Sequence, residues 1–300
     1  MVKIDFKLTK DLKEKYIELL CNRKFGRGKN SKTILEKFEE YKKLFDGYTL
    51  KDIIFIRPEN MRGLIENIEA KNPNIDELRK LFKYDGKFQP IIAKFFEEYL
   101  NPITCYYCNI DYINVYGKRS KKNKFTLDHF IDKGRYPYLA LSIFNLIPSC
   151  YICNSKLKGS TPFYGDNELE NGNPHLKNFD FDEKVKFKLF LSKDCRDFNI
   201  QSKYDIEIEL KERYSNNYKK YIEIFKLNER HQAHKNIVFE MIEKAQLYPE
   251  SRLKELEKLT GVPYQQIKRD IFKLIDDEVN LSKEPFSKLK RDIAYELELI

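Results

Sequence analysis

Hydrophobic residues in the first hundred positions recur every three or four residues, the spacing that places them on one face of a helix. Leu12, Tyr16, Leu19 and Leu20 follow this spacing, and Ser31 is the expected N-cap of the next helix, which runs to about residue 44. The same spacing predicts further helices over residues 60–70, 75–82 and 89–99. We therefore expect residues 1–100 to form a helical N-terminal region.

The pattern changes in the last part of the chain. Residues 185–191 and 204–210 are short apolar stretches, and in the second one Ile206, Ile208 and Leu210 alternate with polar residues, as in a half-buried strand. From about residue 216 the spacing is helical to the end, with breaks near residues 227–228, 248–249, 261–263 and 284–285. Residues 166–300 should thus form short strands and then a helical C-terminal region, and the expected fold class is α+β, mostly α.

Between these regions, residues 101–165 contain two Cys-x-x-Cys pairs. Cys105 pairs with Cys108, and Cys150 pairs with Cys153. Four cysteines in two such pairs are typical of a tetrahedral structural Zn²⁺ site. The 41 residues between the pairs exceed the ~15–20 of a compact zinc ribbon. We therefore expect a zinc frame that encloses a further functional element.

The interval between the cysteine pairs carries motifs in a specific order. These are Thr126-Leu127-Asp128-His129-Phe130, then Asn145-Leu146-Ile147-Pro148-Ser149-Cys150, then Cys153-Asn154 followed by Lys156. Together with the cysteines, this order resembles the HNH endonuclease family of the ββα-metal type, built on a zinc frame. The resemblance covers residues 101–165 and implies a small ββα core inserted between helical flanks. Outside this core the chain resembles, more loosely, HNH proteins of bacterial phage-defence systems.

The resemblance implies a role for each polar residue of the motifs. His129 is the general base, Asp128 and Asn154 are ligands of a catalytic Mg²⁺ or Mn²⁺, and Asn145 orients the loop that fixes His129. A neutral imidazole with a pKa near ~6.5 can accept a proton from water at neutral pH, and oxygen ligands suit Mg²⁺. On residue type alone, a buried loop residue that serves only turn geometry is the favoured interpretation of Asn145. The family often has His at the position of Asn154, so the preferred metal stays open.

The roles of Asp128 and His129 require their side chains to point to the same place. Successive residues of a strand point to opposite faces, so Asp128 and His129 converge only if the strand ends or bulges there. About 60 residues do not hold such a site rigidly unaided, and zinc supplies the support. Because Asn154 directly follows Cys153, the zinc knuckle also sets the start of a short helix over residues 151–158.

Basic residues near the motifs are candidate contacts for substrate phosphates. The run 117–124 holds five basic residues in eight, and it either grips the substrate backbone or forms a solvated turn. A single lysine elsewhere is more often ordinary solvated surface. The candidate substrate-binding residues are Lys118, Arg119, Lys121, Lys122, Lys133, Arg135, Lys156 and Lys158.

Composition limits the class of protein and the cellular compartment that we expect. A chain with 34% charged and 14% aromatic residues is typical of a globular protein, and no stretch reaches the ~18 apolar residues of a membrane span. The first residues lack the apolar core of a signal peptide, so we expect the cytoplasm and no membrane contact. In that reducing compartment Cys21 and Cys195 should be small buried hydrophobic residues. His175, His231 and His234 lack the context of a metal motif and should be ordinary loop or helix residues.

The motifs favour a metal-dependent HNH endonuclease that acts on nucleic acid, with DNA favoured, as an effector of anti-phage defence. The formal charge of +9 agrees with such a partner, although 47 acidic residues temper the excess. An ATPase sensor is a further expected partner, by analogy alone. Two alternatives stay open: a zinc-framed nucleic-acid-binding module without catalysis, and an RNA nuclease with the same site.

Overall fold

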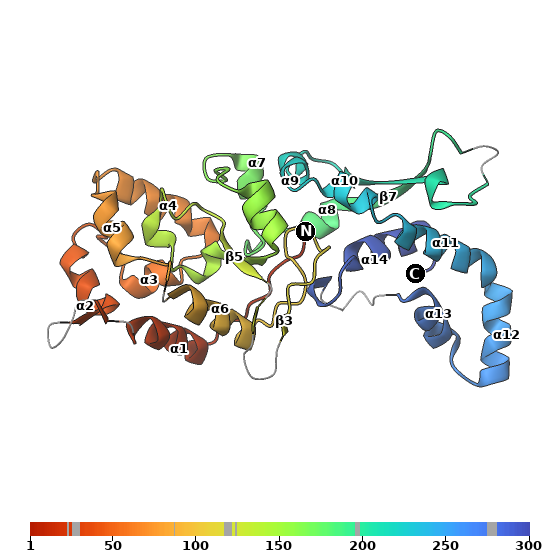
Figure 1. The fold of residues 1–300 in the computed structure, drawn as a ribbon, viewed down its shortest axis with the longest axis horizontal. Helices are drawn as coiled ribbons and strands as arrows, with labels where there is room; N and C mark the ends of the chain where they lie inside the picture. The colour runs from red at the N-terminus through yellow and green to blue at the C-terminus, as the bar shows by residue number, and fades with distance from the viewer. Residues whose placement is uncertain are drawn as a thin grey trace.

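The structure is a computed structural model that describes residues 1–22, 24–25, 31–86, 88–116, 122–123, 125–195, 199–274 and 281–300. The fold is mixed α+β, about half helical, with small antiparallel sheets of two strands each. Figure 1 shows an elongated molecule with the N-terminal helices at one end, the central strands in the middle and the C-terminal helices at the other end. None of the helices in the described ranges has the length and apolar character needed to cross a membrane.

Helices dominate the N-terminal region, as predicted. Ser31 is not an N-cap, however. The helix begins at Ile34, because Thr33 and Glu36 form a reciprocal capping box that satisfies two backbone donors. The elements are α1 (Lys10–Cys21), β1 (Lys24–Phe25), β2 (Lys32–Thr33), α2 (Ile34–Phe38), η2 (Glu39–Tyr41), α3 (Leu50–Ile54), α4 (Pro58–Glu69), α5 (Ile75–Leu81) and α6 (Phe88–Tyr99).

The central region is built around one hairpin. Strand β5 (Thr126–His129) pairs antiparallel with β6 (Leu146–Ser149), with His129 opposite Leu146 at the end of the ladder. A short helix, η5 (Ile152–Lys158), follows β6 after Cys150 and winds as a π-helix. The other elements before and between these strands are β3 (Val115–Tyr116), β4 (Lys122–Asn123), η3 (Pro137–Leu139) and η4 (Ile143–Asn145).

The C-terminal region contains the two predicted strands. β7 (Val185–Leu191) has the predicted bounds, whereas β8 (Ile206–Glu212) begins two residues later than predicted because Lys203–Asp205 forms a short 3-10 turn, η6. The helices are α7 (Asn167–Glu170), α8 (Phe181–Lys184), α9 (Lys219–Ile224), α10 (Leu227–Gln232), α11 (Asn236–Leu247), α12 (Glu250–Thr260), α13 (Tyr264–Phe272), η7 (Leu281–Lys283) and α14 (Ser287–Glu296).

The three regions are joined by buried contacts. The buried hydrophobic residues of the described chain form one cluster that extends from Met1 to Leu299. Asn109, in the loop of the first cysteine pair, donates from Nδ2 to the Leu281 carbonyl (3.0 Å) and accepts from Ser287 Oγ (3.0 Å). The Val2 amide donates to the Tyr106 carbonyl (3.1 Å). The central region is therefore held by both flanks.

Candidate functional site

The four cysteines of the two pairs meet in the centre of the molecule. The sulfur atoms of Cys105, Cys108, Cys150 and Cys153 lie within 4.8 Å of one another, and all four residues are buried. Backbone amides also approach the sulfurs, including the Cys150 amide at 3.3 Å from Cys105 Sγ. Thiolates at this spacing suit a tetrahedral ion, so the cluster could hold a metal such as Zn²⁺. The predicted clustering is confirmed, and the cysteines are not joined in disulfides.

A residue that the sequence did not reveal lies against this cluster. Arg230 of α10 donates to Cys153 Sγ (3.2 Å), Cys108 Sγ (3.5 Å) and the carboxylate of Asp111 (3.1 Å). Four thiolates around a divalent ion leave a net charge of −2, which the guanidinium partly balances. His231 is buried beside Arg230 and bonds to the Cys108 carbonyl (3.0 Å) through Nε2. His231 is thus a structural residue outside the cysteine cluster, and α10 anchors the C-terminal region to the frame.

The first cysteine pair positions Asp128. Tyr107 lies between the two cysteines, stacks on Phe225 at 4.5 Å, and donates its hydroxyl to Asp128 Oδ2 (2.6 Å). Asp128 Oδ1 accepts from the ammonium of Lys158 (3.1 Å), which also donates to the His129 carbonyl (2.8 Å). Asp128 and Lys158 are both buried. Each oxygen of the Asp128 carboxylate therefore has a partner in this structure, and Tyr107 is a site residue that its place inside a Cys-x-x-Cys pair could have indicated.

His129 is held by contacts from two sides. Its Nε2 lies 3.0 Å from the Ala140 carbonyl, and its ring packs edge-on against Tyr84 with the centroids 4.5 Å apart. Because a carbonyl only accepts, Nε2 carries the proton and Nδ1 keeps its lone pair. Burial, with the positive charge of Lys133, lowers the pKa of His129 to about 3. The imidazole is therefore neutral at pH 7, with one nitrogen able to accept a proton.

Asn145 fixes the loop between the two strands. It is fully buried, accepts the Ile131 amide on Oδ1 (2.7 Å), and donates from Nδ2 to the carbonyls of Ile131 (3.0 Å) and Leu139 (3.1 Å). The next carbonyl after Leu139, that of Ala140, is the one that holds His129. The amide thus determines the position of the His129 partner, which agrees with the orienting role that the resemblance implies.

One solvent-open pocket brings Asp128, His129 and Asn154 together. Its volume is about 250 Å³. Asn154 Nδ2 donates to Thr126 Oγ1 (2.8 Å) on β5, which couples the helix after the second cysteine pair to the strand. β5 ends at His129, and Asp128 and His129 both line this pocket, although their side chains bond to different partners. Their convergence on one water or ion stays a prediction. Tyr84, from the N-terminal region, also lines this pocket.

The donor atoms of this pocket suit a divalent ion, but Lys158 opposes one at Asp128. Asp128 and Asn154 have the oxygen atoms that Mg²⁺ or Mn²⁺ prefers, yet Asp128 Oδ1 already binds the Lys158 cation. Two unit charges 4 Å apart interact by about 4 kcal/mol at an effective dielectric constant near 20. A doubly charged ion would be repelled by roughly twice that energy while Lys158 stays in place. The catalytic ion therefore stays a prediction.

The predicted substrate-binding residues fall into different environments. Lys133 pairs with Asp85, Arg135 packs on Tyr136, and Lys156 is exposed beside Tyr151. Lys158 is buried at Asp128. Of the basic run, Lys118, Arg119, Lys121 and Lys124 lie outside the described residues, as does the side chain of Lys122.

A basic groove opens beside the His129 pocket. Its volume is about 620 Å³, and it shares Tyr84, Asp85 and Lys133 with that pocket. Its floor includes the buried rings of Phe82 and Tyr84. The charged residues along it are Asp76, Arg79, Lys80, Lys83, Asp85 and Lys133, which together carry a formal excess of two positive charges. The sequence did not link α5 to the site, because contacts across 50 residues leave no local pattern.

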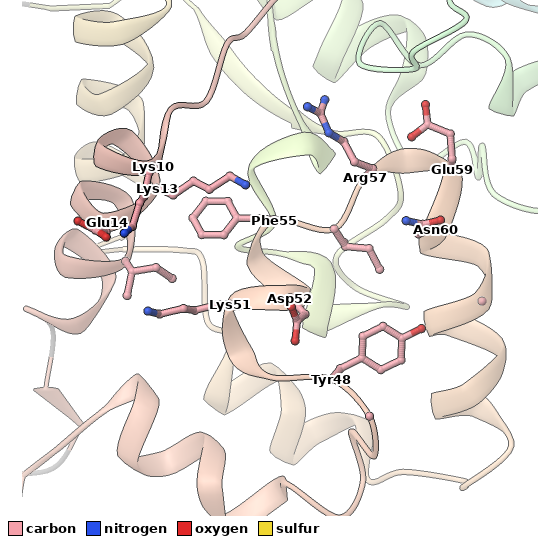
Figure 2. Close-up of a pocket in the computed structure, with 14 residues that line it drawn as sticks. Lys10, Lys13, Glu14, Tyr48, Lys51, Asp52, Phe55, Arg57, Glu59 and Asn60 are labelled. Carbon is pink, nitrogen blue, oxygen red and sulfur yellow. The ribbon is translucent and has the colours of Figure 1, made fainter.

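A larger cavity lies elsewhere in the N-terminal region. It measures about 880 Å³ and is open between α1, α3 and α4, and charged residues of both signs line it, among them Lys13, Glu14, Lys51, Asp52 and Arg57 (Figure 2). None of the candidate catalytic residues lines it. We assign the site to the smaller pocket, because that pocket combines a neutral histidine, a buried carboxylate and an amide.

Cys21 and Cys195 differ from their prediction. Both are only half-buried. Cys21 is the last residue of α1, and Cys195 lies in the turn after β7. The ends of helices and turns of this kind leave part of a side chain in solvent, so neither thiol is a core residue.

Because the His175 imidazole is buried, we expect the protein to lose stability in acid. Burial lowers the pKa of His175 to about 4, below the ~6.5 of an unfolded chain. Between these values the unfolded state binds more protons, so the free energy of unfolding should fall as the pH falls. From pH 6.5 to pH 5 this single residue should account for about 2 kcal/mol. Urea unfolding at both pH values should show a loss smaller by that amount in His175→Phe than in the wild type, and equal losses would contradict the assignment.

Comparisons with models of protein families, with curated proteins and with solved structures found no match for this chain.

Proposed function

We propose that this protein is a nuclease that hydrolyses phosphodiester bonds in nucleic acid, with DNA favoured, through an HNH-type site on a structural zinc frame. The proposal rests mainly on the position and the neutral state of the His129 ring. Its Nε2 is fixed by the Ala140 carbonyl, its ring is neutral, and it lines one pocket with Asp128 and Asn154. The order of hairpin, paired cysteines and short helix also agrees with the ββα core that the resemblance implies.

The chemistry follows from the positions of these groups. His129 Nδ1 accepts a proton from water, the water oxygen bonds to phosphorus, and the bond from phosphorus to the leaving oxygen breaks as that oxygen takes up a proton from solvent. A phosphate bound in the pocket brings negative charge to the ring. That charge raises the pKa of the imidazole toward the neutral range, where a general base is most effective. Asn154 and Lys133 line the same pocket and supply polar contacts for the phosphate.

The experiment that tests the proposal is a cleavage assay with zinc-loaded protein. Supercoiled plasmid, linear duplex, single-stranded DNA and total RNA are incubated with the protein, with no added divalent ion and with Mg²⁺ or Mn²⁺. Cleavage of DNA that is lost in His129→Ala supports the proposal. Cleavage of RNA alone would favour an RNA nuclease, and tight binding without any cleavage would favour the binding module.

The place of this activity in anti-phage defence, and an ATPase sensor as its trigger, belong to the same proposal. They rest on the resemblance alone. Figure 1 shows helices on either side of β5, the strand that carries Asp128 and His129, and we propose these flanks as the docking region for such a partner. Cleavage measured with and without a candidate ATPase would test whether the site needs one.

The basic groove predicts where the substrate backbone lies. Lys80 and Lys83 are exposed on the groove, near the C-terminal end of α5. The double change Lys80→Glu and Lys83→Glu should weaken binding to all sequences alike. It should also lower the slope of binding against salt concentration by about 0.9 for each duplex phosphate that the protein no longer neutralises.

The matched control for the groove is the pair Lys254→Glu and Lys258→Glu. Both residues are exposed on α12, at the opposite end of the molecule from α5 (Figure 1). This control carries the same change of charge. Binding and its salt slope, measured by fluorescence anisotropy, should stay close to wild type in the α12 pair. An equal effect of both pairs would show that net charge, and not the groove, determines binding.

A further inference from the structure

Lys158 occupies a position that surface lysines do not. Its ammonium lies 3.1 Å from Asp128 Oδ1 and 2.8 Å from the His129 carbonyl, and 5.1 Å from the centroid of the Phe163 ring. The side chain is only 4% exposed, and that of Asp128 is 5% exposed. A carboxylate, a carbonyl and an aromatic face together form a binding site for one cation.

This internal cation balances the charge of Asp128. A buried carboxylate without a partner is strongly destabilised, so Asp128 needs a positive charge nearby in the folded protein. Tyr107 supplies a hydrogen bond to Oδ2 but no charge. Among the described residues, Lys158 is the partner that forms an ion pair with Asp128. Removal of Lys158 would leave a buried negative charge at the end of the catalytic strand.

The release of Lys158 that an exchange would require is a movement of one side chain. It is the last residue of η5 and is followed by exposed Gly159, and it lines the solvent-open pocket. Lysine has a flexible stem of four carbons, so rotation of the side chain carries the ammonium into the pocket. Asp128 would then face the pocket with a free oxygen.

We propose that Lys158 is a displaceable cation that holds the ion position at Asp128, and that a divalent ion binds Asp128 only by exchange with it. The proposal rests on the proposed function, because the resemblance to HNH endonucleases is what implies the ion. While Lys158 is in place, the site should therefore bind a divalent ion only weakly. Once released, the ammonium lies in the same pocket as the substrate phosphate, which reconciles the buried position of Lys158 with its predicted contact to substrate.

Binding of Mn²⁺ tests the exchange directly. Zinc-loaded wild type, Lys158→Met and Lys156→Met are titrated with Mn²⁺ alone, and free Mn²⁺ is followed by electron paramagnetic resonance. Methionine keeps the length of the side chain and removes its charge. Lys156 is the matched control because it is exposed on the same helix. We expect Lys158→Met to bind Mn²⁺ at least about tenfold more tightly than the other two proteins, and Asp128→Ala in the Lys158→Met background to abolish the gain.

A second measurement uses the wild type, in case Lys158→Met does not fold. Lysines are modified by reductive methylation with and without Mn²⁺, and the extent at each position is read by mass spectrometry. Lys158 should be protected without Mn²⁺ and become reactive with it, whereas Lys156 should be reactive in both states. Constant protection of Lys158 at saturating Mn²⁺, or unchanged affinity in folded Lys158→Met, would overturn the exchange.

Neither the Mn²⁺ titration nor the lysine methylation measures cleavage of nucleic acid. A failed exchange therefore leaves the nuclease proposal to its own assay. Conversely, absence of cleavage both with and without a candidate ATPase, together with a clear exchange, would remove the nuclease proposal and leave an ion-binding site.

Discussion

His129→Ala protein should lose nearly all cleavage. The expected loss is a factor of ~10²–10⁴, the usual contribution of a general base, and it should be larger if the pocket acts as a unit. The reason is that Nδ1 is the nitrogen left free when Nε2 donates to Ala140. The initial rate of plasmid cleavage under excess enzyme is the measurement.

Folding and substrate binding provide the controls for this change. His129 bonds to one carbonyl and packs on Tyr84, so its loss should leave zinc content unchanged and binding close to wild type. His234→Ala is the matched variant, since His234 packs on Phe286, away from the pocket. It should cleave normally. Full activity of pure His129→Ala protein would return the chain to the binding-module alternative.

The second large effect is expected from the four-cysteine cluster. Cys150→Ser should abolish stoichiometric metal binding and lower the melting temperature sharply or prevent folding. Zinc binding contributes ~10–16 kcal/mol in small zinc modules, which is comparable with the ~5–15 kcal/mol stability of a typical domain. Here the cluster also contacts Arg230 of α10, which donates to Cys153 Sγ, and the first cysteine pair encloses Tyr107, which donates to Asp128. Its loss should therefore affect the central and C-terminal regions together.

Cys21→Ser is the comparison for the zinc prediction. Cys21 is a free, half-buried thiol outside the cluster. Metal analysis should give about one zinc per chain for wild type and for Cys21→Ser, with similar melting temperatures. A Cys150→Ser protein that keeps its zinc and its melting temperature would disprove a structural metal site.

Local features were predictable where the signal is carried by neighbouring residues. Helical spacing identified α1, α4, α5 and α6, because each buries one face. A short apolar stretch identified β7, and alternation of apolar with polar residues identified most of β8. The error at Ser31 has the same origin. Thr33 and Glu36 together form a capping box, which is a more specific signal for the start of a helix than a single serine.

The candidate site was only partly predictable. Spacing alone indicated the cysteine cluster, and the motif order indicated Asp128, His129, Asn145 and Asn154. It did not indicate their partners. Tyr84, Arg79 and Lys80 come from the N-terminal region, and Arg230 comes from α10. Such partners come together through packing between segments far apart in sequence. This packing leaves no repeating pattern in the sequence.

The sequence by itself determined the α+β class, the paired thiols and the residue types available for hydrolysis, since these depend on the order and spacing of residues along the chain. Only the tertiary structure decided which nitrogen of His129 is protonated and which group pairs with Asp128. The loop held by Asn145 presents the Ala140 carbonyl to His129 Nε2, and this acceptor favours the tautomer with the proton on Nε2. The structure also showed Asp128 paired with Lys158, 30 residues away in the chain. Both outcomes depend on distances of about 3 Å between groups that the folded loop and helix bring together.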